Sequence, residues 1–181
     1  MLTQLRMDHA NMARMLHVLQ LKKKTLDQGE RPNFKLMREV VDYILAYMDE
    51  FAMPLEKICV ERLEQKAPED LPFMEKMAED YRQLKPTLAQ LSDDIDMILM
   101  DNVLPMDRFA QDLSAYLEAH RTYLRHEREH LFPLIDKYFT AEDMEELRQA
   151  LPDKAQQELQ RLQDDYPELY AELNNAEVPN V

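Results

Sequence analysis

The chain has 181 residues, enough for one sizeable hydrophobic core, and it contains one glycine and no tryptophan. Leu, Met, Ala, Glu, Lys, Arg and Gln dominate; these residues favour helices, whereas a β protein of this size would need many glycines in its turns. The formal net charge of −14 disfavours binding to nucleic acid or to an anionic membrane surface, because both are polyanions.

The first two predicted helices cover the N-terminal third of the chain. Apolar residues recur at steps of three and four from 2 to 27, and Gly29 and Pro32 predict that this helix ends there. A second helix is predicted from 33 to 65. Pro54 lies inside it, and because the apolar pattern continues beyond the proline we expect a kink and not a stop.

Two further long helices complete the set. The third is predicted from 71 to 101, with Pro86 off its apolar face, and the fourth from 105 to 138. Four apolar stripes joined by short connections predict an all-α fold, an antiparallel up-down-up-down four-helix bundle with short additional C-terminal helices.

The C-terminal part of the chain differs in charge from the rest. Residues 141–181 hold 11 acidic and three basic residues, which is typical of a solvated helical surface. We therefore divide the chain into a bundle, 1–138, and an acidic helical extension packed on it or trailing it, 139–181. Short helices are predicted at 141–150, after an N-cap at Thr140, and at 152–164 and 167–174.

Polar residues interrupt the four apolar stripes at positions that should be buried. In an up-down-up-down bundle, the starts of the first and third helices meet the ends of the second and fourth, so these polar side chains should share one layer. They are His9, Glu56, Tyr81, His120, Tyr123, Glu127 and His130. Such a layer can be satisfied by a metal held by nitrogen and oxygen ligands, or by a metal-free hydrogen-bonded cluster with Lys57 or Arg121 as counter-charge.

Four stretches, one in each predicted helix, carry an ordered pattern of acids, histidines and prolines. They are LRMDHANMARMLHVL (5–19), YILAYMDEFAMPLEKICVERL (43–63), EDYRQL (79–84) and AYLEAHRTYLRHEREHLFPLID (115–136). In this order they resemble the hemerythrin-like family, also called the HHE cation-binding family, over about residues 1–138. For members that bind two irons, the resemblance implies a role in sensing, storing or reacting with oxygen, nitric oxide or related species.

The family's ligand positions carry over unevenly. His9, Glu56 and Glu127 fall on ligand positions of the family. The paired histidines of the second helix are replaced by Ala52 and Met53.

Tyrosines replace two more of the family's histidines. Tyr81 occupies the position in the third helix and Tyr123 the position in the fourth, while His120 lies one turn away and could substitute. The predicted metal residues are therefore His9, Glu56, Glu127, Tyr81, Tyr123 and His120, for one iron ion, a pair, or none.

Other residues that could carry chemistry have simpler interpretations. Cys59 is the only cysteine, so no intramolecular disulfide can form; it reads as a small core side chain, and a reducing cytoplasm is the expected compartment. His126 and His130 could chelate a metal at their spacing of four residues, but their charged neighbours favour a solvated face. The sequence contains no nucleophile–base pattern or phosphate loop, and so gives no support for an enzyme.

Two functional hypotheses follow from these observations. The first is a non-enzymatic, hemerythrin-like bundle that binds a metal ion, and with it a small diatomic gas, at an atypical site in a gas, redox or iron-stress role. The second is a metal-free bundle that acts as an interaction or regulatory module, with a protein partner or a homodimer and the acidic extension as docking surface.

Overall fold

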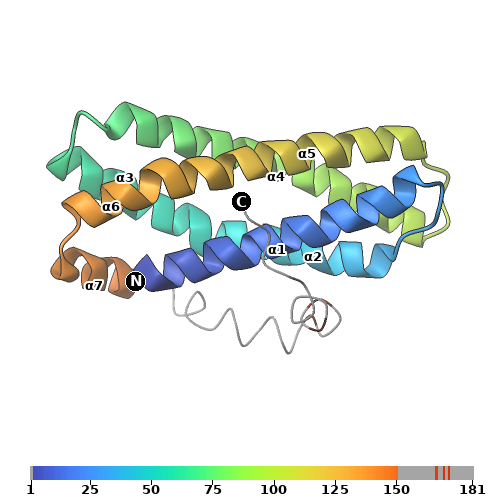
Figure 1. Cartoon of the computed structure of the whole chain (residues 1–181), viewed down its shortest axis with the longest axis horizontal. Helices are drawn as coiled ribbons and strands as arrows, with labels where there is room; N and C mark the ends of the chain where they lie inside the picture. Colours follow the sequence, from blue (N-terminus) through green and yellow to red (C-terminus); the bar gives the residue numbers. More distant parts are fainter. Residues whose placement is uncertain (1, 151–165, 167–168, 170, 172–181) are drawn as a thin grey trace.

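The computed structural model describes residues 2–150, 166, 169 and 171, and within them it contains helices and no strands. The helices form a bundle of four long rods that lie side by side, and two of the rods are built from three consecutive helical segments each (Figure 1). The bounds are α1 Leu2–Asp27, α2 Phe34–Tyr47, η1 Met48–Ala52, α3 Met53–Lys66, α4 Leu71–Leu99, α5 Met106–His126, η2 Glu127–Leu131, α6 Phe132–Tyr138 and α7 Ala141–Ala150. The all-helical prediction is confirmed.

The connection between α1 and α2 is fixed by local backbone chemistry. Gly29 adopts a φ of 77°, and the amides of Gly29 and Glu30 donate to the carbonyls of Leu26 and Thr25 at 3.0 and 3.2 Å. This pair of bonds closes the last turn of α1 in the pattern that a C-terminal glycine permits. Asn33 then caps α2, because its side-chain oxygen accepts from the amide of Leu36 at 3.0 Å.

Both composite rods pass through a π-helical turn just before a proline. In η1 the amide of Met53 donates to the carbonyl of Met48, five residues back, and Pro54 follows. In η2 the amide of Phe132 donates to the carbonyl of Glu127, and Pro133 follows. The α-helical ladder restarts after each turn, so each proline occupies a first-turn position where no amide is needed. The helix therefore continues through Pro54, as predicted, by means of a π-turn.

The apolar stripes were predicted with different success. Helical periodicity places eight residues on the apolar face of the third helix, and all eight are buried in α4: Met74, Met77, Tyr81, Leu84, Leu88, Leu91, Ile95 and Ile98. Pro86 is exposed, as expected.

For the second helix, the same periodicity places Leu45, Met48, Ala52, Glu56, Cys59 and Leu63 on the apolar face. The buried stripe of this rod is instead Ile44, Met48, Phe51, Leu55, Cys59 and Leu63, and Leu45, Ala52 and Glu56 lie half-buried at its edge.

The π-turn in the fourth rod explains one wrong position. His130 was placed on the buried stripe, but it is exposed, and burial resumes at Phe132 and Ile135. A π-turn adds one residue to the turn, so every later side chain is rotated by about 100° relative to an unbroken α-helix.

Helix α7 packs against α3 at one end of the bundle (Figure 1). Thr140 caps it as predicted: the amide of Asp143 donates to the Thr140 hydroxyl at 3.2 Å, and the amide of Thr140 donates to the Asp143 carboxylate at 2.6 Å. Asp143 is buried and also pairs with Lys66 and Arg62 of α3. The helices expected at 152–164 and 167–174 lie outside the described residues, apart from isolated positions, and the division at 138/139 stays a prediction.

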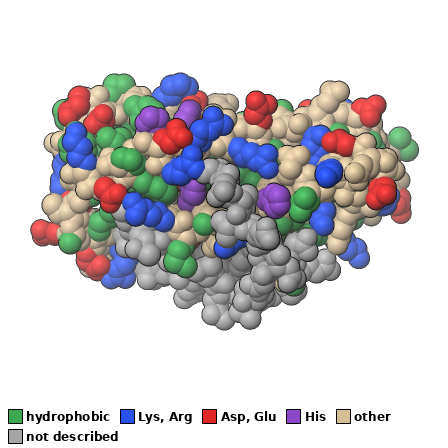
Figure 2. Space-filling view, viewed as in Figure 1, with side chains coloured by type: hydrophobic (Ala, Val, Ile, Leu, Met, Phe, Trp, Pro, Cys, Tyr) green, Lys and Arg blue, Asp and Glu red, His purple; other side chains and the backbone are tan. Residues whose placement is uncertain are grey.

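The surface carries charge of both signs. Outside the grey region, Figure 2 shows acidic and basic side chains interspersed, with hydrophobic side chains in small separate areas. None of the described helices combines the length and the apolar character needed to cross a bilayer.

Candidate metal centre

A cavity of about 50 Å³ lies between the rods in the half of the bundle that holds both π-turns. Its wall includes all six residues predicted as a metal site: His9, Glu56, Tyr81, His120, Tyr123 and Glu127. A water needs roughly 10–15 Å³ by this measure, so the cavity has room for an ion with one or two waters. The convergence expected from the directions of the helices is therefore present in the structure.

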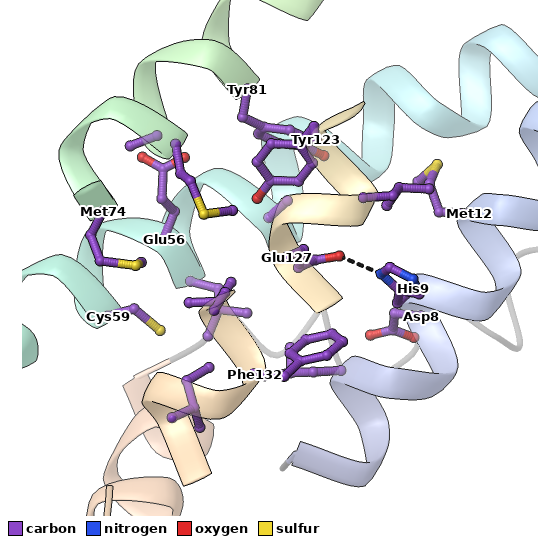
Figure 3. A pocket seen from close by; sticks show the side chains of 18 of the residues that line it. Asp8, His9, Met12, Glu56, Cys59, Met74, Tyr81, Tyr123, Glu127 and Phe132 are labelled. Carbon is purple, nitrogen blue, oxygen red and sulfur yellow. Dashed lines mark hydrogen bonds and ion pairs between the residues drawn. The ribbon is translucent and has the colours of Figure 1, made fainter. Parts of the chain in front are cut away.

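His9 and Glu127 contact each other across the cavity. The two atoms, Nδ1 of His9 and Oε2 of Glu127, are 2.7 Å apart, and the side chains are 12% and 20% exposed (Figure 3). His9 lies in α1, and Glu127 is the first residue of η2, where the π-turn begins. This contact links the first rod to the fourth at the site, and it occupies one coordinating atom of each residue.

Glu56 has one oxygen paired and one without a partner. Its Oε1 accepts from Arg82 of α4 at 3.0 Å, while its Oε2 is buried and has no hydrogen-bond partner among the described residues. Burial raises the pKa of Glu56, and Arg82 opposes that rise. The counter-charge is thus Arg82, and not Lys57 or Arg121 as predicted; Lys57 is exposed, and Arg121 donates to Gln20.

Two tyrosines cover the cavity on the side opposite α1. The rings of Tyr81 and Tyr123 are 4.5 Å apart between centroids and lie directly above Glu127 in Figure 3, with Glu56 to one side and His9 to the other. Burial raises the pKa of both hydroxyls well above the usual value, and the negative charge of Glu127 raises them further. Both tyrosines are therefore neutral phenols at neutral pH in the absence of a cation.

His120 is fully buried beside these rings. Its Nδ1 is 2.8 Å from the hydroxyl of Tyr116, and burial lowers its pKa to about 3, so the imidazole is neutral. No other acceptor for the Tyr116 proton is found within the described residues, so we assign Tyr116 as donor to Nδ1 and the ring proton to Nε2. Nε2 has no partner in the same described part.

Sequence reasoning missed several residues of the cavity wall. Asp8, Met12, Tyr47, Cys59 and Phe132 line it as well. Tyr47 could have been found, because it stands one turn before Phe51 on the buried face of the second rod. Cys59 is a buried core residue, as predicted, and burial, with a smaller contribution from Glu56, raises the pKa of its thiol to about 12.

The second histidine pair is separate from this cavity. The rings of His126 and His130 are 6.0 Å apart, and His130 also packs on Phe73, but neither histidine lines the cavity. His130 is exposed, which agrees with the solvated-face interpretation and not with its placement on the buried stripe, and His126 is half-buried.

The comparison with protein families decides the identity of the fold. The profile of the family described as Hemerythrin HHE cation binding domain matches residues 1–135, about three quarters of the chain. The chain belongs to the hemerythrin HHE cation-binding family. No match was found among curated proteins or among solved structures.

The donor atoms of this hemerythrin-like chain do not fit the histidine-rich iron pair that the resemblance implies. Ala52 and Met53 offer no hard donor, and Tyr81 and Tyr123 stand in place of two histidines. Within residues 2–150 and the three described positions beyond, no group of three or more His, Cys, Asp or Glu side chains is placed to hold a metal ion. The donor groups that line the cavity are three carboxylates, two imidazoles and three phenols: Asp8, Glu56, Glu127, His9, His120, Tyr47, Tyr81 and Tyr123.

Proposed function

We propose that this chain is a non-enzymatic, cation-binding hemerythrin-like bundle whose atypical site holds one iron ion. The observation that supports this proposal is the buried Oε2 of Glu56, which has no hydrogen-bond partner among the described residues and lies in the wall of a cavity that His9 and Glu127 also line. A buried carboxylate oxygen without a partner is costly, and a cation in the cavity would remove that cost.

His9, Glu127 and Glu56 would hold the ion, with the phenols above it. The ion would supply positive charge to the carboxylates of Glu56 and Glu127, which line the cavity together with Asp8; within the described residues, Arg82 pairs with Glu56. His9 would contribute a neutral nitrogen once its contact with Glu127 opens. The gas ligand implied by the resemblance stays an expectation, as does the cytoplasmic location.

A second candidate, a metal-free interaction or regulatory module, is favoured by one observation. His9 and Glu127 already satisfy each other at 2.7 Å, and Arg82 already pairs with Glu56. In this case the layer would be structural, and function would reside on the surface, including the exposed acids of α7.

Elemental analysis of the full chain, produced without a histidine tag and exposed to ferrous iron under anaerobic conditions, separates the two. We expect about one iron per chain, and a loss of binding of roughly 10- to 100-fold in His9→Ala and Glu127→Gln. His17→Ala is the matched control, because His17 lies on the same helix and does not line the cavity. Iron-free protein under all these conditions would leave the metal-free module as the function.

A further inference from the structure

Helix α7 packs behind one part of the cavity wall, beside the start of α1 (Figure 1). Its Leu147 belongs to a cluster of buried apolar residues to which α1, η1, α3 and α6 also contribute: Leu5, Phe51, Leu55, Cys59, Phe132 and Ile135. Apart from Phe51 and Leu147, the buried members of this cluster line the cavity, whereas no described residue of α7 does. Helix α7 is therefore a second layer between this part of the wall and solvent.

Ion pairs show how α7 lies on α3. Asp143 pairs with Lys66 and, at 3.5 Å between Oδ1 and Nε, with Arg62, while Glu146 pairs with Arg62. A later residue of α7 thus meets an earlier residue of α3. The two helices therefore run in opposite directions.

This direction brings Leu147 to the level of Cys59. Leu147 follows Asp143 by four residues, and Cys59 precedes Arg62 by three, so each lies on the face of its helix that carries the ion pairs. Leu147 is 1% exposed and Cys59 is 3% exposed. Leu147 is therefore the side chain of α7 that shields Cys59 from solvent on this side.

The attachment of α7 is small compared with the packing of the four rods. Leu147 and the half-buried Met144 are its apolar contacts with the cluster, and Asp143 is the other buried position within 141–149. A helix of ten residues is marginal in water on its own, so α7 depends on these few contacts. Such an element opens at a lower free energy than the core to which it is attached.

We propose that α7 is a hinged cover, which turns away from the bundle while the four rods stay folded, and which thereby exposes Cys59 and the apolar outer side of the cavity wall. Phe139, whose backbone is extended, and Thr140 join α7 to α6 and act as the hinge. The family profile ends at residue 135, so the cover belongs to the part of the chain beyond the matched bundle. Access to the cavity from this side then depends on how often the cover is open.

The test uses Cys59 as a reporter in the metal-free full chain without denaturant. The exposed thiolate of Cys59 attacks 5,5′-dithiobis(2-nitrobenzoate), a mixed disulfide forms, and one thionitrobenzoate is released and measured by its absorption. Because Cys59 is the only cysteine, the signal reports this position alone. We expect slow labelling in one phase, with a rate that changes little at low urea concentrations, since opening of α7 exposes little surface.

Variants identify the element that opens. Leu147→Ala should raise the labelling rate about 10- to 100-fold, because it removes the main apolar contact of α7. Asp143→Asn should raise it about 2- to 30-fold, because it weakens the pairing with α3. Glu142→Gln, at an exposed position in the first turn of α7, is the matched control and should stay within about twofold.

Phe109→Ala separates opening of the cover from unfolding of the bundle. Phe109 is fully buried between rods and is not a member of the cluster under α7, so its truncation destabilises the whole bundle and should leave the labelling rate within about twofold. Circular dichroism checks that each variant is folded before it is labelled.

The other outcomes would overturn the cover. Labelling that accelerates in Phe109→Ala but not in the α7 variants, or equally in all of them, would mean that Cys59 is reached by unfolding of the bundle. Immediate labelling of the unmodified protein would show that α7 does not shield the thiol, and no labelling of any variant would show that α7 does not open. The protein is metal-free throughout, so none of these results bears on the proposed cation binding.

Discussion

The two halves of the bundle are built on different principles. The site half surrounds the cavity and contains His9, Glu127, both π-turns and the buried oxygen without a partner. The far half, between the cavity and the α1–α2 and α4–α5 connections, is packed by fully buried apolar side chains. These are Leu16, Leu19, Met37, Val41, Leu88, Leu91, Ile95, Phe109 and Leu113.

This difference separates stability from binding. The far half gains free energy by removing apolar surface from water. Among its described residues, the buried polar atom without a hydrogen-bond partner is Nε of Arg14, whose Nη1 donates to Asn11 at 2.9 Å. The site half keeps charged and polar side chains inside, which costs stability unless a partner or an ion satisfies them. Substitutions should therefore affect stability most in the far half and binding most in the site half.

Truncation of a far-half aromatic should have the largest effect on folding. Phe109 is fully buried and packs edge-to-face on Phe34 at 6.0 Å between ring centroids. Phe109→Ala should lower the free energy of unfolding by about 3–5 kcal/mol, because the cavity left behind adds to the lost burial. Denaturant melts measure this change. Val103→Ala changes a side chain that is 95% exposed and should alter the free energy of unfolding by no more than about 0.5 kcal/mol. If both variants lose the same free energy of unfolding, the proposed difference between the two halves is wrong.

The fold was predictable because the hydrophobic periodicity and the residues that end or cap helices indicated the same helix boundaries. Gly29 and Asn33 behave as their residue types require, and the α4 stripe is complete. The π-turns were not predictable from periodicity, since one added residue is invisible in the sequence until burial is known. The prolines at 54 and 133, each six residues after the start of its π-turn, are the signal that could have suggested them.

Six residues of the cavity wall were predictable from the sequence, but the rest of the wall and the pairing of its side chains were not. Alternating helix direction is enough to bring His9, Glu56 and Glu127 to one layer. The choice of Arg82 over Lys57 as counter-charge depends on which side chain of a neighbouring rod can reach the carboxylate. That reach is set by the rotation of the rods, which the π-turns change.

Three of the prolines that lie within helices, Pro54, Pro86 and Pro133, should respond to substitution with different signs. Pro86 lies in the middle of an uninterrupted α-helix, where it removes a hydrogen bond and crowds the carbonyl of Arg82, so Pro86→Ala should raise the free energy of unfolding by about 1–3 kcal/mol. Pro54 and Pro133 occupy first-turn positions after their π-turns, where the proline ring costs little and restricts the unfolded chain. Pro54→Ala and Pro133→Ala should therefore lower it, by up to about 1 kcal/mol.

Thermal melts are sensitive enough for this comparison, since about 1 kcal/mol corresponds to roughly 2–4 °C in Tm for a chain of this size. If Pro54→Ala raises Tm as much as Pro86→Ala does, the π-turns do not remove the steric and hydrogen-bonding cost of the prolines that follow them.

The smallest effect concerns how α7 is held on the site half, and it depends on pH. The Lys66 ammonium, then the amide and hydroxyl of Thr140, hold the pKa of the Asp143 carboxyl well below its usual range. Because the folded pKa lies below the unfolded one, the unfolded chain binds more protons as pH falls below about 4, so the stabilisation is present at neutral pH and is lost on acidification.

Asp143→Asn should remove about 0.5–2 kcal/mol of local stability at pH 7 and flatten the dependence of α7 protection on pH. Amide hydrogen exchange of residues 141–149, compared at pH 3 and pH 5 after correction for intrinsic rates, measures this. Glu142→Gln is the matched control, because Glu142 lies in the same turn and is exposed. If amide protection changes with pH to the same degree in both variants, Asp143 does not hold the helix. If the pH dependence is lost in Asp143→Asn and kept in Glu142→Gln, the acid-sensitive contact lies at the α3–α7 interface and outside the cavity.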